Sequence, residues 1–119
     1  MEKLYKSGKV RSIGVSNWKI SGREAMLRYA AIESMMSQVE IHPFLPNTEL
    51  VEHCFSQDIL PVAYFPLGRQ GQVETTQGTL LQNAELAALA EKKGVTLAQL
   101  LIAWGPKRGL RCRRKVRIW

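Results

Sequence analysis

The stretch Val10-Arg-Ser-Ile-Gly-Val-Ser-Asn-Trp18 carries the clearest structural signal in the chain. Its β-branched residues between positions 10 and 15 favour a buried strand. The run ends in Ser16 and Asn17, two small polar residues that suit a turn or a helix N-cap. A strand that ends this way and leads into a helix is half of a βα unit. Parallel α/β folds place their ligand-binding residues at such strand ends.

The same alternation of strand and helix recurs downstream. Apolar residues at helical spacing around the polar Arg23, Glu24 and Arg28 predict an amphipathic helix over about 19–31. A second strand is expected over 36–42, where apolar and polar residues alternate. The first helix therefore connects two strands.

A second helix and a third strand complete the pattern. The helix is expected over 48–57 with Asn47 as its N-cap, and the strand over 59–64. Strands joined through helices must be parallel, and their crossovers are right-handed. The sequence thus predicts an α/β fold with about three parallel strands.

The second half of the chain has fewer strand signals. Residues 65–78 contain glycines and polar residues and predict a surface loop. Two helices are expected over 84–93 and 97–104, with Asn83 and Thr96 as their N-caps. No fourth strand is predicted after residue 109, because the sequence there has neither alternation nor an apolar run.

Composition restricts the class of protein. The chain has 119 residues, of which 45% are hydrophobic and 23% charged, as in an ordinary globular domain. No apolar run approaches the length of a transmembrane helix, and residues 2–7 predict the end of a helix rather than a secretory signal. Cys54 and Cys112 are widely spaced, which argues against a disulfide framework. We therefore expect a cytoplasmic protein without a transmembrane segment.

The basic charge lies in a tail. The net charge is +7, and ten of the seventeen Lys and Arg residues are balanced by the ten Asp and Glu residues of 1–106. The unbalanced cations lie in the last thirteen residues: Lys107, Arg108, Arg111, Arg113, Arg114, Lys115 and Arg117. Such a run could bind phosphate backbones or an acidic membrane surface, but it is usually a solvated extension. We regard nucleic-acid binding as unlikely.

The ends of the three predicted strands present polar and aromatic residues. They are Ser16 with Asn17, then Gln38 with Glu40 and His42, then Tyr64. Hydroxyl and amide side chains can hold a carboxamide through paired donors and acceptors, and tyrosine offers a face for stacking. The set would suit a planar ring with a carboxamide, such as nicotinamide. A turn cap, a strand amide and a core tyrosine explain the same residues without a ligand.

A metal site was the other possibility among these residues. Glu40 and His42 are two apart on a strand and share a face, and His53 lies further along. The spacing does not supply a three-ligand arrangement, so no metal is predicted. The glycines also fit no dinucleotide-binding fingerprint.

The chain resembles the aldo-keto reductase family across about residues 1–109. The resemblance rests on five blocks in the family's order: Gly8-Lys-Val-Arg-Ser-Ile-Gly-Val-Ser-Asn17, Gln38-Val-Glu-Ile-His-Pro43, Ala63-Tyr-Phe-Pro-Leu-Gly68, Leu80-Leu-Gln-Asn83, and Gly94-Val-Thr-Leu-Ala-Gln99 with Trp104. It implies a TIM (β/α)8 barrel that binds NADPH and reduces a small carbonyl substrate by hydride transfer. Such barrels need about 250 residues, so a partial barrel lacking its first half and last strand is expected.

The resemblance also assigns cofactor-binding residues by position. Ser16, Asn17 and Gln38 would hold the nicotinamide carboxamide, Tyr64 would stack on its ring, and Leu67 would line the pyrophosphate path. The family usually has serine where this chain has Phe65, which weakens the expected grip on the pyrophosphate. The family's proton-donating tyrosine and its partners lie in the missing half. No catalytic residue is therefore assigned.

Two domains are predicted, a partial barrel over 1–109 and a basic divergent tail over 110–119. After Gly109 the basic tail stands where the family has its eighth strand. Our hypothesis is an altered reading frame or splice boundary after Gly109. An open half-barrel exposes strand edges, so we expect it to pair with a complementing half-barrel or with itself, and to be inactive alone. The alternatives are a non-catalytic interaction or regulatory fragment, or a nucleic-acid or membrane binder that acts through the tail.

Overall fold

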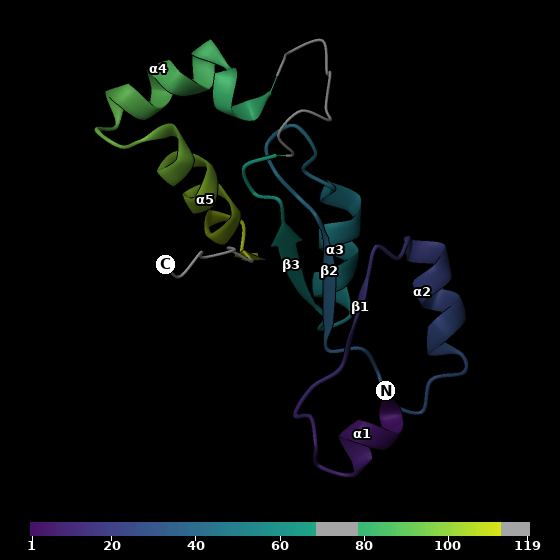
Figure 1. Cartoon of the computed structure of the whole chain (residues 1–119). Coiled ribbons are helices and arrows are strands. Elements are labelled where there is room, and N and C mark those ends of the chain that lie inside the picture. Colours follow the sequence, from purple (N-terminus) through teal and green to yellow (C-terminus); the bar gives the residue numbers. More distant parts are fainter. Residues whose placement is uncertain (69–78, 113–119) are drawn as a thin grey trace. The chain divides into compact units, whose positions relative to one another are not determined.

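The computed structural model describes residues 1–68 and 79–112 of the chain, in which helices and strands alternate (Figure 1). In chain order the elements are α1 (Glu2–Lys6), β1 (Gly14–Ser16), α2 (Ile20–Leu27), β2 (Met36–Glu40), α3 (Thr48–Ser56), β3 (Leu60–Tyr64), the short 3-10 helix η1 (Leu80–Gln82), α4 (Ala84–Lys92), α5 (Leu97–Lys107) and β4 (Arg111–Cys112). The predicted α/β class is confirmed.

The strands form one four-stranded sheet in the order β1-β2-β3-β4. β1 and β2 are parallel, with Gly14 opposite Met36 and Ser16 opposite Gln38. A Cβ atom on Gly14 would lie 2.8 Å from the carbonyl oxygen of Met36, so this close pairing requires glycine. Sequential strands are neighbours in the sheet, as in a piece of a (β/α)8 barrel.

The chain divides into two compact units, and each is described by itself. Unit 1 comprises Met1–Val39 and Asn47–Val62, and unit 2 comprises Glu40–Pro46 and Ala63–Trp119. The most buried apolar residues of unit 1 are Ile13, Val39, Val51, Cys54 and Ile59, and those of unit 2 are Ile41, Ala63, Leu80, Ala90, Leu101 and Leu110.

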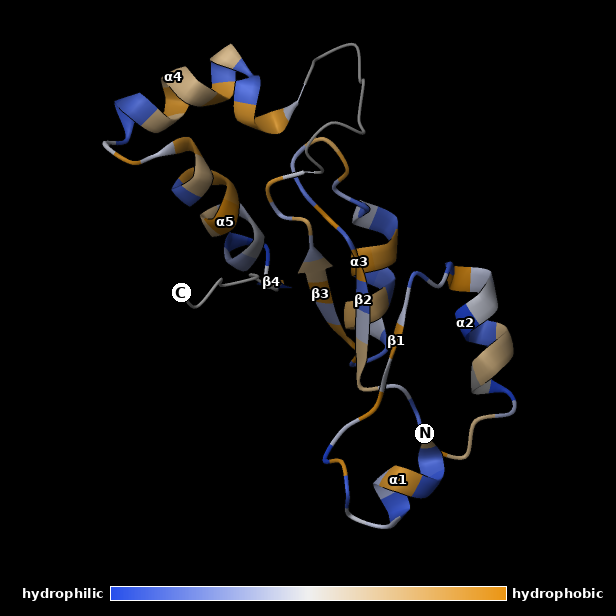
Figure 2. Cartoon of the chain, in the orientation of Figure 1, coloured by the Kyte–Doolittle hydropathy of each residue, from blue (hydrophilic) through white to orange (hydrophobic). Residues whose placement is uncertain are grey.

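In unit 2, α4 contacts α5 and η1, and α5 contacts β4. Both helices carry apolar and polar residues, as expected for helices with one buried face (Figure 2). The predicted caps are confirmed. The Asn83 side chain accepts a hydrogen bond from the backbone N–H of Leu86 at 2.9 Å. Thr96 and Gln99 form a reciprocal capping box at the start of α5.

The predicted N-cap of α3 has the expected position, but its side chain makes no capping hydrogen bond. Asn47 occupies the N-cap position, but its backbone is left-handed (φ 44°) and its side chain does not cap the helix. Asparagine tolerates this conformation better than most residues do. The role of Asn47 is therefore to turn the chain into α3.

The helix predicted over 19–31 is shorter, and one of its polar residues is buried. Arg23 lies on α2 with 1% of its surface exposed, and its Nη1 donates to the Cys54 sulfur on α3 at 2.8 Å. Its Nε and Nη2 atoms have no hydrogen-bond partner within the described part of the chain. A local pattern of polarity does not record this contact, because Cys54 lies on another helix, thirty-one positions along the chain.

The structure differs from the sequence prediction after residue 109. Leu110 is buried, Arg111 is exposed and Cys112 is half-buried, so a short alternation exists and forms β4. The surrounding cations obscured this pattern in the sequence. Most of the predicted loop (69–78) and most of the tail (113–119) lie outside the described residues. Within the described ranges, every helix is too short or too polar to cross a membrane.

Candidate functional site

The pairing of β1 with β2 brings three of the predicted site residues together in unit 1. Ser16 is the last residue of β1 and lies opposite Gln38 in the parallel register. Asn17 follows in a left-handed conformation (φ 59°), and its backbone N–H donates to the Gln38 carbonyl oxygen at 3.0 Å. Ser16 and Asn17 are exposed and Gln38 is half-buried. A hydroxyl and two amides therefore gather where β1 ends beside the middle of β2.

Gln38 lies on the more open face of its strand. Along β2, Ser37 and Val39 are buried, whereas Met36, Gln38 and Glu40 are half-buried. Alternate residues of a strand point to opposite faces. The face that carries Gln38 is thus the one that remains partly accessible to a ligand.

The two other predicted site residues, Tyr64 and Leu67, belong to unit 2. Tyr64 ends β3, and its ring contacts the Phe65 ring edge to face, with centroids 5.2 Å apart and planes at 78°. Phe65 has a left-handed backbone (φ 47°), and its carbonyl oxygen accepts from the N–H of Gly68 at 2.8 Å. Leu67 is a half-buried member of this turn.

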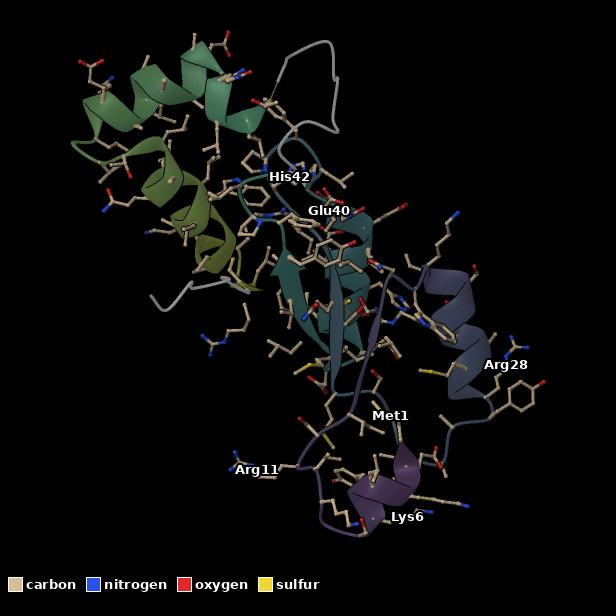
Figure 3. The ribbon with its side chains drawn as sticks, in the orientation of Figure 1. Met1, Lys6, Arg11, Arg28, Glu40 and His42 are labelled. Atoms are coloured by element: carbon tan, nitrogen blue, oxygen red, sulfur yellow. The ribbon has the colours of Figure 1, made fainter. Side chains whose placement is uncertain are left out.

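Glu40 and His42 form a contact in unit 2, as expected from their spacing (Figure 3). The distance from His42 Nε2 to Glu40 Oε1 is 3.4 Å, which is long for a hydrogen bond. Burial lowers the pKa of His42 from its ordinary value, and Glu40 opposes that shift only partly. Burial therefore favours the neutral form of the His42 imidazole.

No group of metal ligands is present in the described ranges. Three or more His, Cys, Asp or Glu side chains nowhere gather in residues 1–68 and 79–112 in a way that could hold an ion. His53 belongs to unit 1, whereas Glu40 and His42 belong to unit 2.

Sequence reasoning missed Arg108, which follows α5 in unit 2. Its Nη1 donates to the carbonyl oxygen of Pro46 at 3.0 Å, and its guanidinium lies 4.8 Å from the centre of the Trp104 ring. Arg108 therefore anchors the loop after β2 to the end of α5. The signal was available, since residues four apart on a helix lie on one face.

Parallel strands followed by helices, with polar residues at the strand ends, define a fragment of a (β/α)8-barrel type of protein. A model of the family described as "Aldo/keto reductase family" matches residues 1–112. The chain belongs to the aldo/keto reductase family.

Curated relatives agree with this membership. Over 109 residues the chain is 54% identical to a glycerol 2-dehydrogenase (NADP(+)) of Hypocrea jecorina, a match that covers 92% of this chain and 34% of the relative. It is 41% identical to a glyoxal reductase of Bacillus subtilis, over 92% of this chain and 37% of the relative. It is 40% identical to an NAD(P)H-dependent D-xylose reductase of Scheffersomyces stipitis, over 92% of this chain and 36% of the relative. The chain spans about a third of the length of these relatives.

Proposed function

We propose that this chain is the nicotinamide-binding part of an NADPH-dependent carbonyl reductase. Ser16, Asn17 and Gln38 would hold the carboxamide, Tyr64 would stack on the ring, and Leu67 would line the path of the pyrophosphate. NADPH, when bound, supplies the hydride that reduces an aldehyde or ketone. The main support is the register that places Asn17, directly after β1, beside Gln38 of the neighbouring strand β2.

The donor set fits a nicotinamide carboxamide. An amide ligand needs both a donor and an acceptor, and the exposed side chains of Ser16 and Asn17 offer both, as does half-buried Gln38. The fit is poorer toward the pyrophosphate, where Phe65 adds an apolar ring that cannot donate a hydrogen bond. We therefore assign to the chain an orienting role at the nicotinamide end of the cofactor.

No catalytic residue of the chain is part of this proposal. The reduced carbonyl oxygen requires a proton, and by the family resemblance the tyrosine that donates it has no counterpart among residues 1–109. The 119-residue chain alone should therefore bind cofactor without turnover of a generic aldehyde. A rate above the enzyme-free background that survives repurification would contradict this part of the proposal.

The cytoplasmic location remains part of the proposal and is supported by the two free thiols, Cys54 and Cys112.

An association with another polypeptide also belongs to the proposal. β1 is at one edge of the sheet and borders an apolar cavity of about 560 Å³ in unit 1, lined in part by Val15, Trp18 and Met26. A free edge strand beside apolar surface favours pairing with a further strand and helix. A complementing half-barrel or a second copy would supply them. Light scattering across a concentration series should detect self-association, and a constant monomer mass would exclude the second copy.

Titration with NADPH, followed by tryptophan fluorescence, tests the cofactor proposal. Gln38→Leu keeps the side-chain volume and removes the amide, so binding should weaken by about tenfold or more. The matched control is Gln57→Leu, which removes an exposed amide at the end of α3. Equal affinities of the two variants would refute the assignment of Gln38.

A further inference from the structure

Phe65 adopts a conformation that its own chemistry does not favour. It has a left-handed backbone (φ 47°), and 48% of its surface is exposed. A bulky side chain is a genuine outlier in this region, and the residue before a proline prefers extended backbone. Neither local preference nor burial of the ring explains this geometry.

The position of Phe65 suggests a functional reason. It follows directly on β3, and ligands of parallel α/β folds bind at the carboxyl ends of strands. Strained residues persist where the surrounding structure holds them, and they cluster at such sites. The turn closed by Gly68 N–H on the Phe65 carbonyl oxygen, at 2.8 Å, holds this strain.

The ring of Phe65 contacts the ring of the preceding residue, Tyr64. It meets the Tyr64 ring with centroids 5.2 Å apart and planes at 78°, within the range of favourable edge-to-face pairs. Tyr64 is half-buried, and the Phe65 ring lies against it at nearly a right angle. An edge-to-face contact of this kind limits the rotation of the Tyr64 ring.

We propose that Phe65 is a positioning residue that fixes the ring plane of Tyr64 so that it can stack on a flat heteroaromatic ligand. The inference rests on the proposed function, in which that ligand is the nicotinamide ring. Phe65 acts through Tyr64, and a ring that is held in place loses less entropy when a ligand stacks on it. The strained backbone is the cost of this pre-organisation.

The first test compares affinity with stability in the full chain. Phe65→Leu should weaken NADPH binding about two- to tenfold, because an aromatic pair is lost, and Phe65→Tyr should restore it. Phe65→Gly removes the ring and relieves the left-handed strain, so it should weaken binding while the melting temperature stays equal or rises. A merely structural role would lower both quantities. Phe55→Leu is the matched control, since Phe55 is 44% exposed on α3.

A double-mutant cycle tests whether Phe65 acts through Tyr64. In a Tyr64→Leu background, Phe65→Leu should have little further effect on NADPH affinity. Reduced nicotinamide mononucleotide should show the same loss as NADPH, because the effect is confined to the ring. An unchanged affinity of Phe65→Leu for both ligands, or effects that add in the double variant, would overturn the inference.

Ring spectroscopy separates this inference from the proposed function. In nuclear magnetic resonance spectra without ligand, Phe65→Leu should shift the Tyr64 ring protons and speed the flipping of that ring, whereas Phe55→Leu should not. Unchanged Tyr64 signals would refute the positioning role whether or not NADPH binds. If the wild-type chain binds no NADPH but the Tyr64 signals respond, the cofactor proposal fails and the coupling of the two rings stands.

Discussion

The backbone N–H of Asn17 donates to the carbonyl oxygen of Gln38 at 3.0 Å, one residue after the end of β1. The parallel ladder therefore continues through the first residue of the turn. Because Asn17 is left-handed there, the chain leaves the sheet while its backbone remains tied to β2. Two amide-bearing residues from separate parts of the sequence are thus held in a fixed register.

Replacing the buried Arg23 should stabilise the chain. It is 1% exposed, and two nitrogens of its guanidinium have no hydrogen-bond partner among residues 1–68 and 79–112. Arg23→Met should raise the free energy of unfolding by about 1–4 kcal/mol, as seen when well-packed apolar residues replace buried charges. Urea denaturation measures the change. Arg28→Met, at the exposed end of α2, should change it by less than about 0.5 kcal/mol. A loss of stability in Arg23→Met would show that the Arg23–Cys54 contact is net stabilising.

The buried imidazole of His42 should make stability depend on pH. Burial lowers its pKa in the folded chain below the ordinary value of 6.5, so the unfolded chain binds the proton more readily. The contribution is present above pH 6.5 and is lost as the pH falls through the folded pKa. The denaturation midpoint of the wild type should therefore fall as the pH is lowered from about 8 to about 5, the range in which histidine titrates. The midpoint of His42→Gln should fall less over the same range.

Glu40 supplies the control for this pH effect. Its carboxylate raises the pKa of His42 and so opposes the effect of burial. Glu40→Gln should lower that pKa further, and the loss of stability at acid pH should become steeper than in the wild type. A profile for Glu40→Gln that is flatter than the wild-type profile would contradict the assignment.

A close contact between α5 and β4 explains the glycine at position 105. A Cβ atom on Gly105 would meet the Cys112 sulfur, although alanine is the better helix former. Gly105→Ala should therefore destabilise the chain by about 1–3 kcal/mol through overpacking. Combined with Cys112→Ala, the same substitution should recover most of the loss. Thermal unfolding measures both, and equal losses in the single and double variants would exclude this contact as the cause.

Local features of the fold were predictable from sequence, and long-range ones were not. The caps at Asn83 and Thr96 were recognised because each acts within one helical turn. The burial of Arg23 depends on Cys54, thirty-one positions away, and no local pattern records such a contact. The short β4 was missed because Leu110 and Cys112 alternate over only three residues within a basic run.

The candidate site, like the fold, was predictable from the sequence only in part. Ser16, Asn17 and Gln38 were expected at strand ends. Ser16 and Asn17 lie at the end of β1, whereas Gln38 lies opposite them in the middle of β2. Their role in binding a cofactor stays a prediction, as do those of Tyr64 and Leu67. The left-handed backbone of Phe65 could not be anticipated, because aromatic residues rarely adopt it.

A double-mutant cycle on Asn17 and Gln38, measured by calorimetric titration with NADPH, tests the central claim most directly. Asn17→Gly keeps the left-handed backbone and removes the amide, and Gln38→Leu removes the second amide. If both side chains hold one carboxamide, each single variant should bind about tenfold or more weakly, and the double variant should lose less than the sum of the two. Wild-type affinity in both single variants would contradict the account.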